Sequence, residues 1–130
     1  MTESDPEYRH QLRVRYAETD AGGVAHHSSY VAWLEEARTE WMRGRGRSYA
    51  DVEASGFFLM VADMHLRYLR PTRYDDELSV SVRVKERRRV SLDLEYEIRR
   101  VGEDDPLATA TTRLACTDRE GKVRRLPEGV

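Results

Sequence analysis

The sequence predicts a single domain of the α+β class, in which a curved antiparallel sheet wraps around one long central helix. Residues 29–43 repeat apolar side chains at helical spacing, whereas residues 8–16 and most of 57–118 alternate with the period of a strand. One amphipathic helix cannot bury its apolar face alone, so the strands must cover it. The 130 residues are enough for one core. We therefore expect one domain over residues 1–130, with a flexible tail over residues 1–6.

The first strand is expected over residues 8–16, because its even positions suit a buried face and its odd positions hold Arg or Gln. Gly22-Gly23 interrupts this pattern. The long helix then presents one apolar face, formed by Tyr30, Leu34, Ala37 and Trp41 and widened by Val31 and Trp33.

The ends of the helices carry their own signals. Ser28 or Ser29 is expected to cap the long helix, and Gly44 to lie just past its end. Glu40 is placed to pair with Arg43 on its outer surface. A short second helix is expected after Ser48, which forms a capping-box pattern with Asp51.

Four further strands are expected over residues 57–69, 77–86, 90–100 and 106–118. The connections "ERRR" and "VGEDDP" are short, so a meander of antiparallel neighbours is predicted. The edge strands of such a sheet need a partner, and pairing with a second copy of the chain is one simple solution.

Composition excludes several classes of function. The net charge of -2 gives no reason to expect nucleic acid or an anionic membrane as a partner. Cys116 is the only cysteine, which rules out an intrachain disulfide and a Cys-rich zinc site; we expect it to be buried in a strand. The first ten residues lack the apolar core of a signal peptide, and no apolar run reaches the ~20 residues of a membrane span. A cytoplasmic location is predicted.

Two carboxylates, a glycine pair and two histidines lie just before the long helix, in "ETDAGGVAHH". A helix start offers unpaired N–H groups and a partial positive charge, which can hold a developing oxyanion. A carboxylate facing the same point can attack a carbonyl or activate water. Gly22 and Gly23 let a substrate approach the backbone. This combination indicates acyl transfer or hydrolysis.

Simpler interpretations compete with this one. Asp20 can be a turn residue that hydrogen-bonds its own backbone, and Glu18 a solvated charge at a strand end. His26 and His27 are adjacent, so they are poorly placed to bind one ion, and no metal is expected. The hairpin "VKERRRVS" is either a solvated turn or a surface site where arginine binds phosphate groups.

The chain resembles the hotdog-fold acyl-CoA thioesterases of the 4-hydroxybenzoyl-CoA thioesterase type, and within them the branch associated with the Tol-Pal system. The resemblance rests on "RVRYAETDAGGVAHHSSYVAWLEEARTEWMR", then "LRYLRPTRYDDELSVSV", "KERRRVSL" and "CTDREGKVRRLP". It covers roughly residues 11–127. It implies a homodimer that assembles into a homotetramer, with sites shared between protomers, and a reaction without a cofactor.

The resemblance also implies roles for single residues. Asp20 corresponds to the catalytic carboxylate, and the backbone N–H of His27 to the group that polarises the thioester carbonyl. The substrate-binding positions that it implies, together with the glycine noted above, are Tyr16, Gly23, Tyr30, Arg88 and Arg89. The expected substrate is an acyl-CoA or the thioester of an acyl carrier. The alternatives are an enoyl-CoA hydratase or dehydratase, and a non-catalytic acyl-CoA-binding protein.

Two positions depart from the family pattern. The family commonly has Asp-Thr-Asp where this chain has Glu18-Thr19-Asp20, and an aromatic residue where this chain has His26. The second difference leaves the acyl specificity open.

Overall fold

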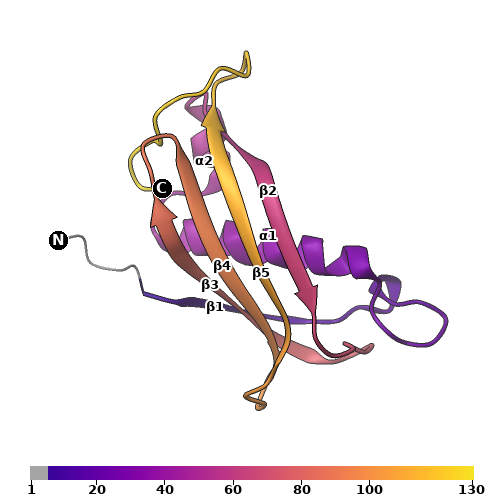
Figure 1. Ribbon diagram of the computed structural model, residues 1–130. Coiled ribbons are helices and arrows are strands. Elements are labelled where there is room, and N and C mark those ends of the chain that lie inside the picture. The colour runs from indigo at the N-terminus through magenta and orange to yellow at the C-terminus, as the bar shows by residue number, and fades with distance from the viewer. Residues whose placement is uncertain (1–5) are drawn as a thin grey trace.

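A computed structural model describes residues 6–130, which form one antiparallel sheet of five strands and a long helix across one of its faces (Figure 1). The tail predicted over residues 1–6 lies, apart from Pro6, outside the described residues. The elements in chain order are β1 (Tyr8–Arg13), a 3-10 turn (Tyr16–Glu18), α1 (His27–Gly44), α2 (Tyr49–Ala54), β2 (Phe58–Tyr68), β3 (Glu77–Arg87), β4 (Ser91–Arg100) and β5 (Pro106–Thr117). The predicted α+β class and the wrapped helix are confirmed.

The core lies between α1 and the inner face of the sheet. The helix buries Tyr30, Trp33, Leu34, Ala37 and Trp41, and the sheet buries the alternating residues of β3 and β4, among them Leu78, Val80, Leu92, Leu94 and Ile98. Each such fully buried large side chain stabilises the fold by roughly 1.5–3 kcal/mol. Val31 is 41% exposed, so its predicted place on the inward face is wrong, while that of Trp33 is confirmed.

The strand order is β1-β3-β4-β5-β2, which corrects the predicted meander. β3, β4 and β5 are consecutive neighbours, but β2 pairs with β5 and β3 pairs with β1. Short turns join β3 to β4 and β4 to β5. Residues 69–76 are too long and too rich in irregular backbone for a tight hairpin, and they carry the chain from the edge strand β2 to β3, next to the opposite edge strand β1. We call residues 69–76 the crossover segment.

The helix starts differ in part from the predictions. α1 begins at His27, and His26 occupies the cap position without a side-chain capping bond, so neither serine caps the helix. Gly44 is its last residue. The capping box of α2 is confirmed, because Ser48 Oγ accepts the Asp51 N–H and Asp51 Oδ2 accepts the Ser48 N–H. The pair between Glu40 and Arg43 is also present, at 3.3 Å.

Cys116 lies in the core of β5, as predicted, and burial raises the pKa of its thiol. Its Sγ–H donates to the carbonyl oxygen of Arg125. A buried thiol with a raised pKa is a poor nucleophile at neutral pH. Within residues 6–130, no helix has the length and apolar character needed to cross a membrane.

Candidate active site

The loop before α1 holds Asp20 by hydrogen bonds to its own backbone. Asp20 Oδ1 accepts the N–H of Gly22 at 2.8 Å and that of Val24 at 3.3 Å. The Asp20 N–H donates to the Val24 carbonyl, and the Gly23 N–H to the Asp20 carbonyl. Asp20 is therefore a turn residue, but it remains solvent-exposed, and its Oδ2 accepts no hydrogen bond from any described residue. The turn role orients the carboxylate without using both oxygens.

Gly22 and Gly23 each require glycine for a different structural reason. Gly23 has φ +78, in the left-handed region that residues with a Cβ adopt only with strain. A Cβ on Gly22 would come within 3.3 Å of Asp20 Oδ1. Both positions keep the loop tight around the carboxylate.

His27 is the first residue of α1, and its N–H is one of the groups that have no acceptor inside the helix. Its ring packs edge-to-face against Tyr68, with ring centres 4.8 Å apart, and its carbonyl oxygen accepts the Tyr68 phenol at 2.9 Å. The sequence does not indicate Tyr68 as a site residue, because its pattern predicts only that Tyr68 lies near the end of a strand. Burial, followed by the neighbouring Tyr30, raises the pKa of Tyr68.

A hollow of about 290 Å³ lies beside this helix start. Tyr30 forms its inner wall, and the Tyr30 phenol donates to Thr72 Oγ1 at 3.0 Å. The other lining residues are Val24, Ala25, His27, Tyr68, Leu69, Arg70 and Pro71. The hollow thus combines an apolar wall with the N-terminus of a helix, as the family resemblance implies for Tyr30 and His27.

The crossover segment is hydrogen-bonded to the Asp20 loop. The Ala25 N–H donates to the Thr72 carbonyl at 2.7 Å, and the Tyr74 N–H donates to the Gly23 carbonyl at 3.0 Å. Val24 and Arg73 also form an isolated β-bridge. The geometry of the loop therefore depends on where the crossover segment lies.

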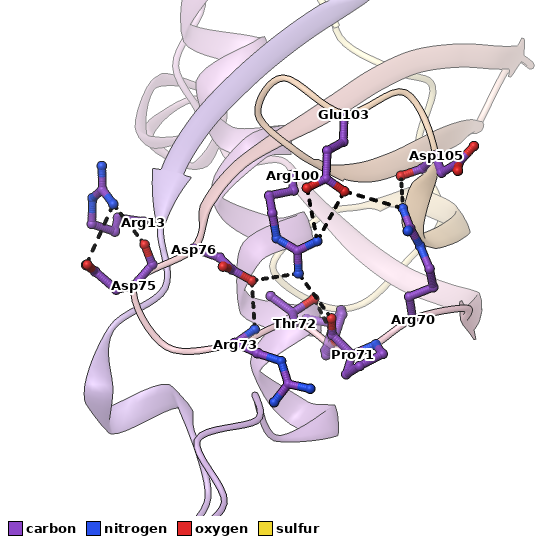
Figure 2. A network of polar contacts seen from close by, with 11 residues as sticks. Arg13, Arg70, Pro71, Thr72, Arg73, Asp75, Asp76, Arg100, Glu103 and Asp105 are labelled. Carbon is purple, nitrogen blue, oxygen red and sulfur yellow. Dashed lines mark hydrogen bonds and ion pairs between the residues drawn. The ribbon is translucent and has the colours of Figure 1, made fainter.

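An ion pair fixes the crossover segment to β4 (Figure 2). Asp76 Oδ2 accepts Arg100 Nη2 and the Arg73 N–H, both at 2.9 Å. Partial burial opposes ionisation of Asp76, but these hydrogen bonds outweigh it and lower its pKa. Arg100 also donates to the Pro71 carbonyl and pairs with Glu103. No local pattern in the sequence indicates that residues 76 and 100 meet.

Glu18 is not the solvated charge that the sequence suggested. Its side chain is only 11% exposed, and its carboxylate accepts the Arg15 N–H at 2.7 Å and the Trp33 Nε1–H at 2.8 Å. Tyr16, in contrast, is 77% exposed and packs edge-to-face on Tyr74, away from the hollow's lining. A substrate-binding role for Tyr16 stays a prediction. His26 is exposed, and its N–H donates to the Glu18 carbonyl.

The basic hairpin lies at the far end of the sheet from the Asp20 loop (Figure 1). β3 has 11 residues between them, a span of about 35 Å. Arg88 pairs with Glu86 at 2.6 Å and with Asp93 at 3.0 Å, whereas the Arg89 side chain is exposed and makes no hydrogen bond or ion pair with another described residue. A single protomer therefore does not bring Arg88 or Arg89 to the hollow.

No group of three or more His, Cys, Asp or Glu side chains among residues 6–130 is arranged to hold a metal ion. The structure gathers His27, Tyr30 and the unexpected Tyr68 at the hollow, whereas Asp20 and Gly23 lie in the loop before α1 and are not among the hollow's lining residues. The arrangement offers a carboxylate with one open oxygen, unpaired helix N–H groups and an apolar wall. That chemistry suits attack on a polarised carbonyl.

Comparisons with known proteins identify the family of the chain. A family model described as the thioesterase-like superfamily matches residues 14–130. The acyl-CoA thioester hydrolase YbgC of Escherichia coli O157:H7 is 36% identical over 124 residues, which cover 95% of this chain and 92% of that protein. Acyl-CoA thioesterase YbgC of Haemophilus influenzae is 32% identical over 82% of this chain and 78% of its own length.

Solved structures show the same fold. A DHNA-CoA thioesterase from Staphylococcus aureus superposes with a TM-score of 0.87 at 31% identity, over 92% of this chain and 80% of that one. A probable thioesterase from Bartonella henselae superposes with a TM-score of 0.88 at 31% identity, over 94% of this chain and 100% of that one. The chain belongs to the thioesterase-like superfamily and has its hotdog fold.

Proposed function

We propose that this chain hydrolyses acyl-CoA thioesters, with Asp20 as the nucleophile or general base and the N–H of His27 as the oxyanion donor. The observation that carries the proposal is the loop in which Asp20 Oδ1 is fixed by Gly22 and Val24 while Oδ2 stays open. The same loop leads directly into the N-terminus of α1. The relatives named as acyl-CoA thioester hydrolases support the choice of substrate.

Two routes fit this arrangement. In the nucleophilic route, Oδ2 of Asp20 bonds to the carbonyl carbon, the C–S bond breaks, and the thiolate of CoA takes a proton from solvent. Water then hydrolyses the acyl-aspartate anhydride to the free acid and the carboxylate. In the general-base route, Asp20 takes a proton from a water that adds to the same carbon, and this proton ends on the departing thiolate. The His27 N–H stabilises the oxyanion in both, and neither needs a cofactor.

The proposal includes a homodimer formed along β2, with tetramers built from such dimers. β2 is a sheet edge on which Met60 and Val61 are 55% and 47% exposed, and no described residue pairs with its outer side. An edge of 11 residues with apolar side chains is a template for a second strand. Antiparallel pairing of two β2 strands about a two-fold axis reverses one sheet relative to the other. The basic hairpin of the partner would then lie close to the Asp20 loop of this chain. There the partner's Arg88 and the partner's Arg89 can bind the CoA phosphates.

A hydrolysis panel tests the function. Short, long and aromatic acyl-CoAs and one acyl-carrier thioester are incubated with the protein, and free thiol is measured. Asp20→Asn is the matched variant, because an amide oxygen can still accept from Gly22 and Val24 while the nucleophile is lost. We expect thiol release by the wild type and a loss of at least about a hundredfold in the variant.

Three results would contradict the proposal. Full activity of Asp20→Asn would exclude the mechanism. Addition of water to an enoyl-CoA without thiol release would indicate a hydratase. Tight acyl-CoA binding without turnover would indicate a binding protein.

A further inference from the structure

The indole of Trp33 ties the middle of α1 to the strand-helix loop through Glu18. Trp33 is 2% exposed, and a buried indole N–H needs an acceptor. Glu18 Oε2 supplies it at 2.8 Å, while Glu18 Oε1 accepts the Arg15 N–H at 2.7 Å. The two oxygens of one carboxylate thus hold two different segments.

The backbone of Glu18 also contacts the start of α1. Its carbonyl oxygen accepts the His26 N–H at 2.9 Å and the Ser29 hydroxyl at 2.9 Å. His26 immediately precedes the proposed oxyanion donor, and Ser29 lies in the first turn of α1. The main chain of Glu18 therefore anchors the helix start, and its side chain anchors the helix about two turns further along.

The proposed nucleophile is only two residues beyond this anchor. Asp20 lies between Glu18 and the glycine turn, and its N–H and carbonyl bond back to Val24 and Gly23. Few contacts connect this short turn to the core: the bonds of Glu18 on one side and the crossover segment on the other. A change in the reach of Glu18 would move Asp20 relative to the helix N-terminus.

We propose that Glu18 is a positioning residue, which with Trp33 as its matched partner sets the separation between the Asp20 carboxylate and the His27 N–H. This inference rests on the proposed function. An Asp side chain is shorter by one methylene group, so from the same backbone position its carboxylate would lie farther from Trp33 Nε1. Glu18 and Trp33 are therefore the acceptor and the donor of one contact that links the loop to α1.

A double-mutant cycle separates positioning from general stability. The variants are Glu18→Asp, Trp33→Phe and both together, with kcat and KM measured for thioester hydrolysis. Glu18→Asp leaves the Trp33 N–H buried without its acceptor, and we expect kcat to fall about 10-fold to 100-fold while KM changes little. Trp33→Phe removes the same contact from the other side, so the double variant is expected to lose no more kcat than either single variant.

Two further variants serve as controls. Glu18→Gln keeps the length of the side chain but can accept from only one of the two donors, so an intermediate kcat is expected. It also keeps the test usable if Glu18→Asp does not fold. Glu40→Gln removes a carboxylate that pairs with Arg43 on the same helix, and it is expected to leave kcat unchanged.

A second readout does not need activity. Hydrogen exchange of the Trp33 indole N–H, followed by NMR, is expected to accelerate in Glu18→Asp. The signal is assigned by its loss in Trp33→Phe, since Trp41 is the only other tryptophan. Wild-type kcat in Glu18→Asp, or a double variant whose loss is the product of the single losses, would overturn the proposal. If the wild type releases no thiol, the proposed function fails, and unchanged indole exchange in Glu18→Asp would then overturn the positioning contact as well.

Discussion

The phenol of Tyr68 donates a 2.9 Å hydrogen bond to the carbonyl oxygen of His27, which joins the last residue of β2 to the first residue of α1. The ring of Tyr68 also packs edge-to-face on both His27 and Tyr30, with ring centres 4.8 Å apart in each case. The end of an edge strand therefore determines how the helix start faces the hollow. Since β2 is also the proposed dimer edge, changes at that edge can reach the site through Tyr68.

Replacing Tyr68 by Phe removes this hydrogen bond and keeps the ring. We expect the free energy of unfolding to fall by about 1 kcal/mol, because the lost bond is partly exposed to water. We expect kcat to fall by up to about tenfold, because the helix start is less firmly held. Urea unfolding and thiol release measure the two effects. Tyr74→Phe, at an exposed tyrosine of the crossover segment, is the control for stability, and an equal loss there would contradict the assignment.

Replacing Asp76 by Asn breaks the ion pair with Arg100 and isolates the effect of charge. The pKa of Asp76 is lowered in the folded chain, so its ionised form stabilises the fold above the unfolded pKa. This contribution is lost as the pH falls through the folded pKa. We expect the free energy of unfolding of the wild type to exceed that of Asp76→Asn by about 1.5–3 kcal/mol at pH 7. This difference should shrink below about pH 4.

Urea unfolding between pH 2 and 7 measures this difference. The neighbouring residue gives a matched control, because Asp75 is exposed and its contact with Arg13 is 3.7 Å long. Asp75 has φ +70, a conformation that Asn also tolerates. Asp75→Asn is expected to change stability by less than about 0.5 kcal/mol. A pH-independent difference for Asp76→Asn would show that the carboxylate charge is not what holds the crossover segment.

Local and distant relationships differ in how far the sequence reveals them. Alternating side chains predicted β3 and β4 because one face of each is buried, and the Ser48–Asp51 capping box was visible because its members are three residues apart. The pairing of β2 with β5 has no local signal, since it depends on the path of the crossover segment. The bonds from Glu18 to Trp33 and from Asp76 to Arg100 join residues 15 and 24 positions apart. Asp20 and His27 could be proposed only because they lie in one short motif.

Replacing Gly23 by Ala introduces strain without a collision. The residue has φ +78, and a Cβ there would have no neighbour within 4 Å. We expect a loss of about 1–2 kcal/mol in the free energy of unfolding, and a lower kcat because the Asp20 turn relaxes. Gly46→Ala is the matched control, since Gly46 has φ +94 and is equally open. Both variants are expected to lose stability, and only Gly23→Ala to lose kcat; equal kcat losses would contradict a local effect.

Replacing Val61 by Glu tests the dimer. Val61 is exposed on β2, and a two-fold axis along this edge would bring two new charges close together. We expect the molar mass in light scattering to shift from dimer or larger toward monomer, and the specific activity to fall with the dimer fraction. Val123→Glu, at a residue 58% exposed outside the strands, is expected to leave the mass unchanged. A stable dimer of Val61→Glu would place the interface elsewhere.

Replacing Arg89 by Ala tests whether the basic hairpin binds the nucleotide of CoA. Arg89 is exposed and its side chain makes no hydrogen bond or ion pair with another described residue, so its removal should leave the fold intact. An exposed ion pair contributes about 0.2–1 kcal/mol, so we expect KM for an acyl-CoA to rise about twofold to fivefold with kcat unchanged. The effect should shrink at high salt, because exposed charges are screened.

The same acyl group on pantetheine, which lacks the nucleotide phosphates, provides the internal control. Its KM is expected to be equal in the wild type and in Arg89→Ala, because the arginine then has nothing to bind. Arg119→Ala removes a comparably exposed charge from the turn after β5, and it is expected to leave both KM values unchanged. An equal rise in KM for the two substrates would show that Arg89 acts on the acyl end or on the fold. A fall in kcat at unchanged KM would exclude a role in ground-state binding of the phosphates.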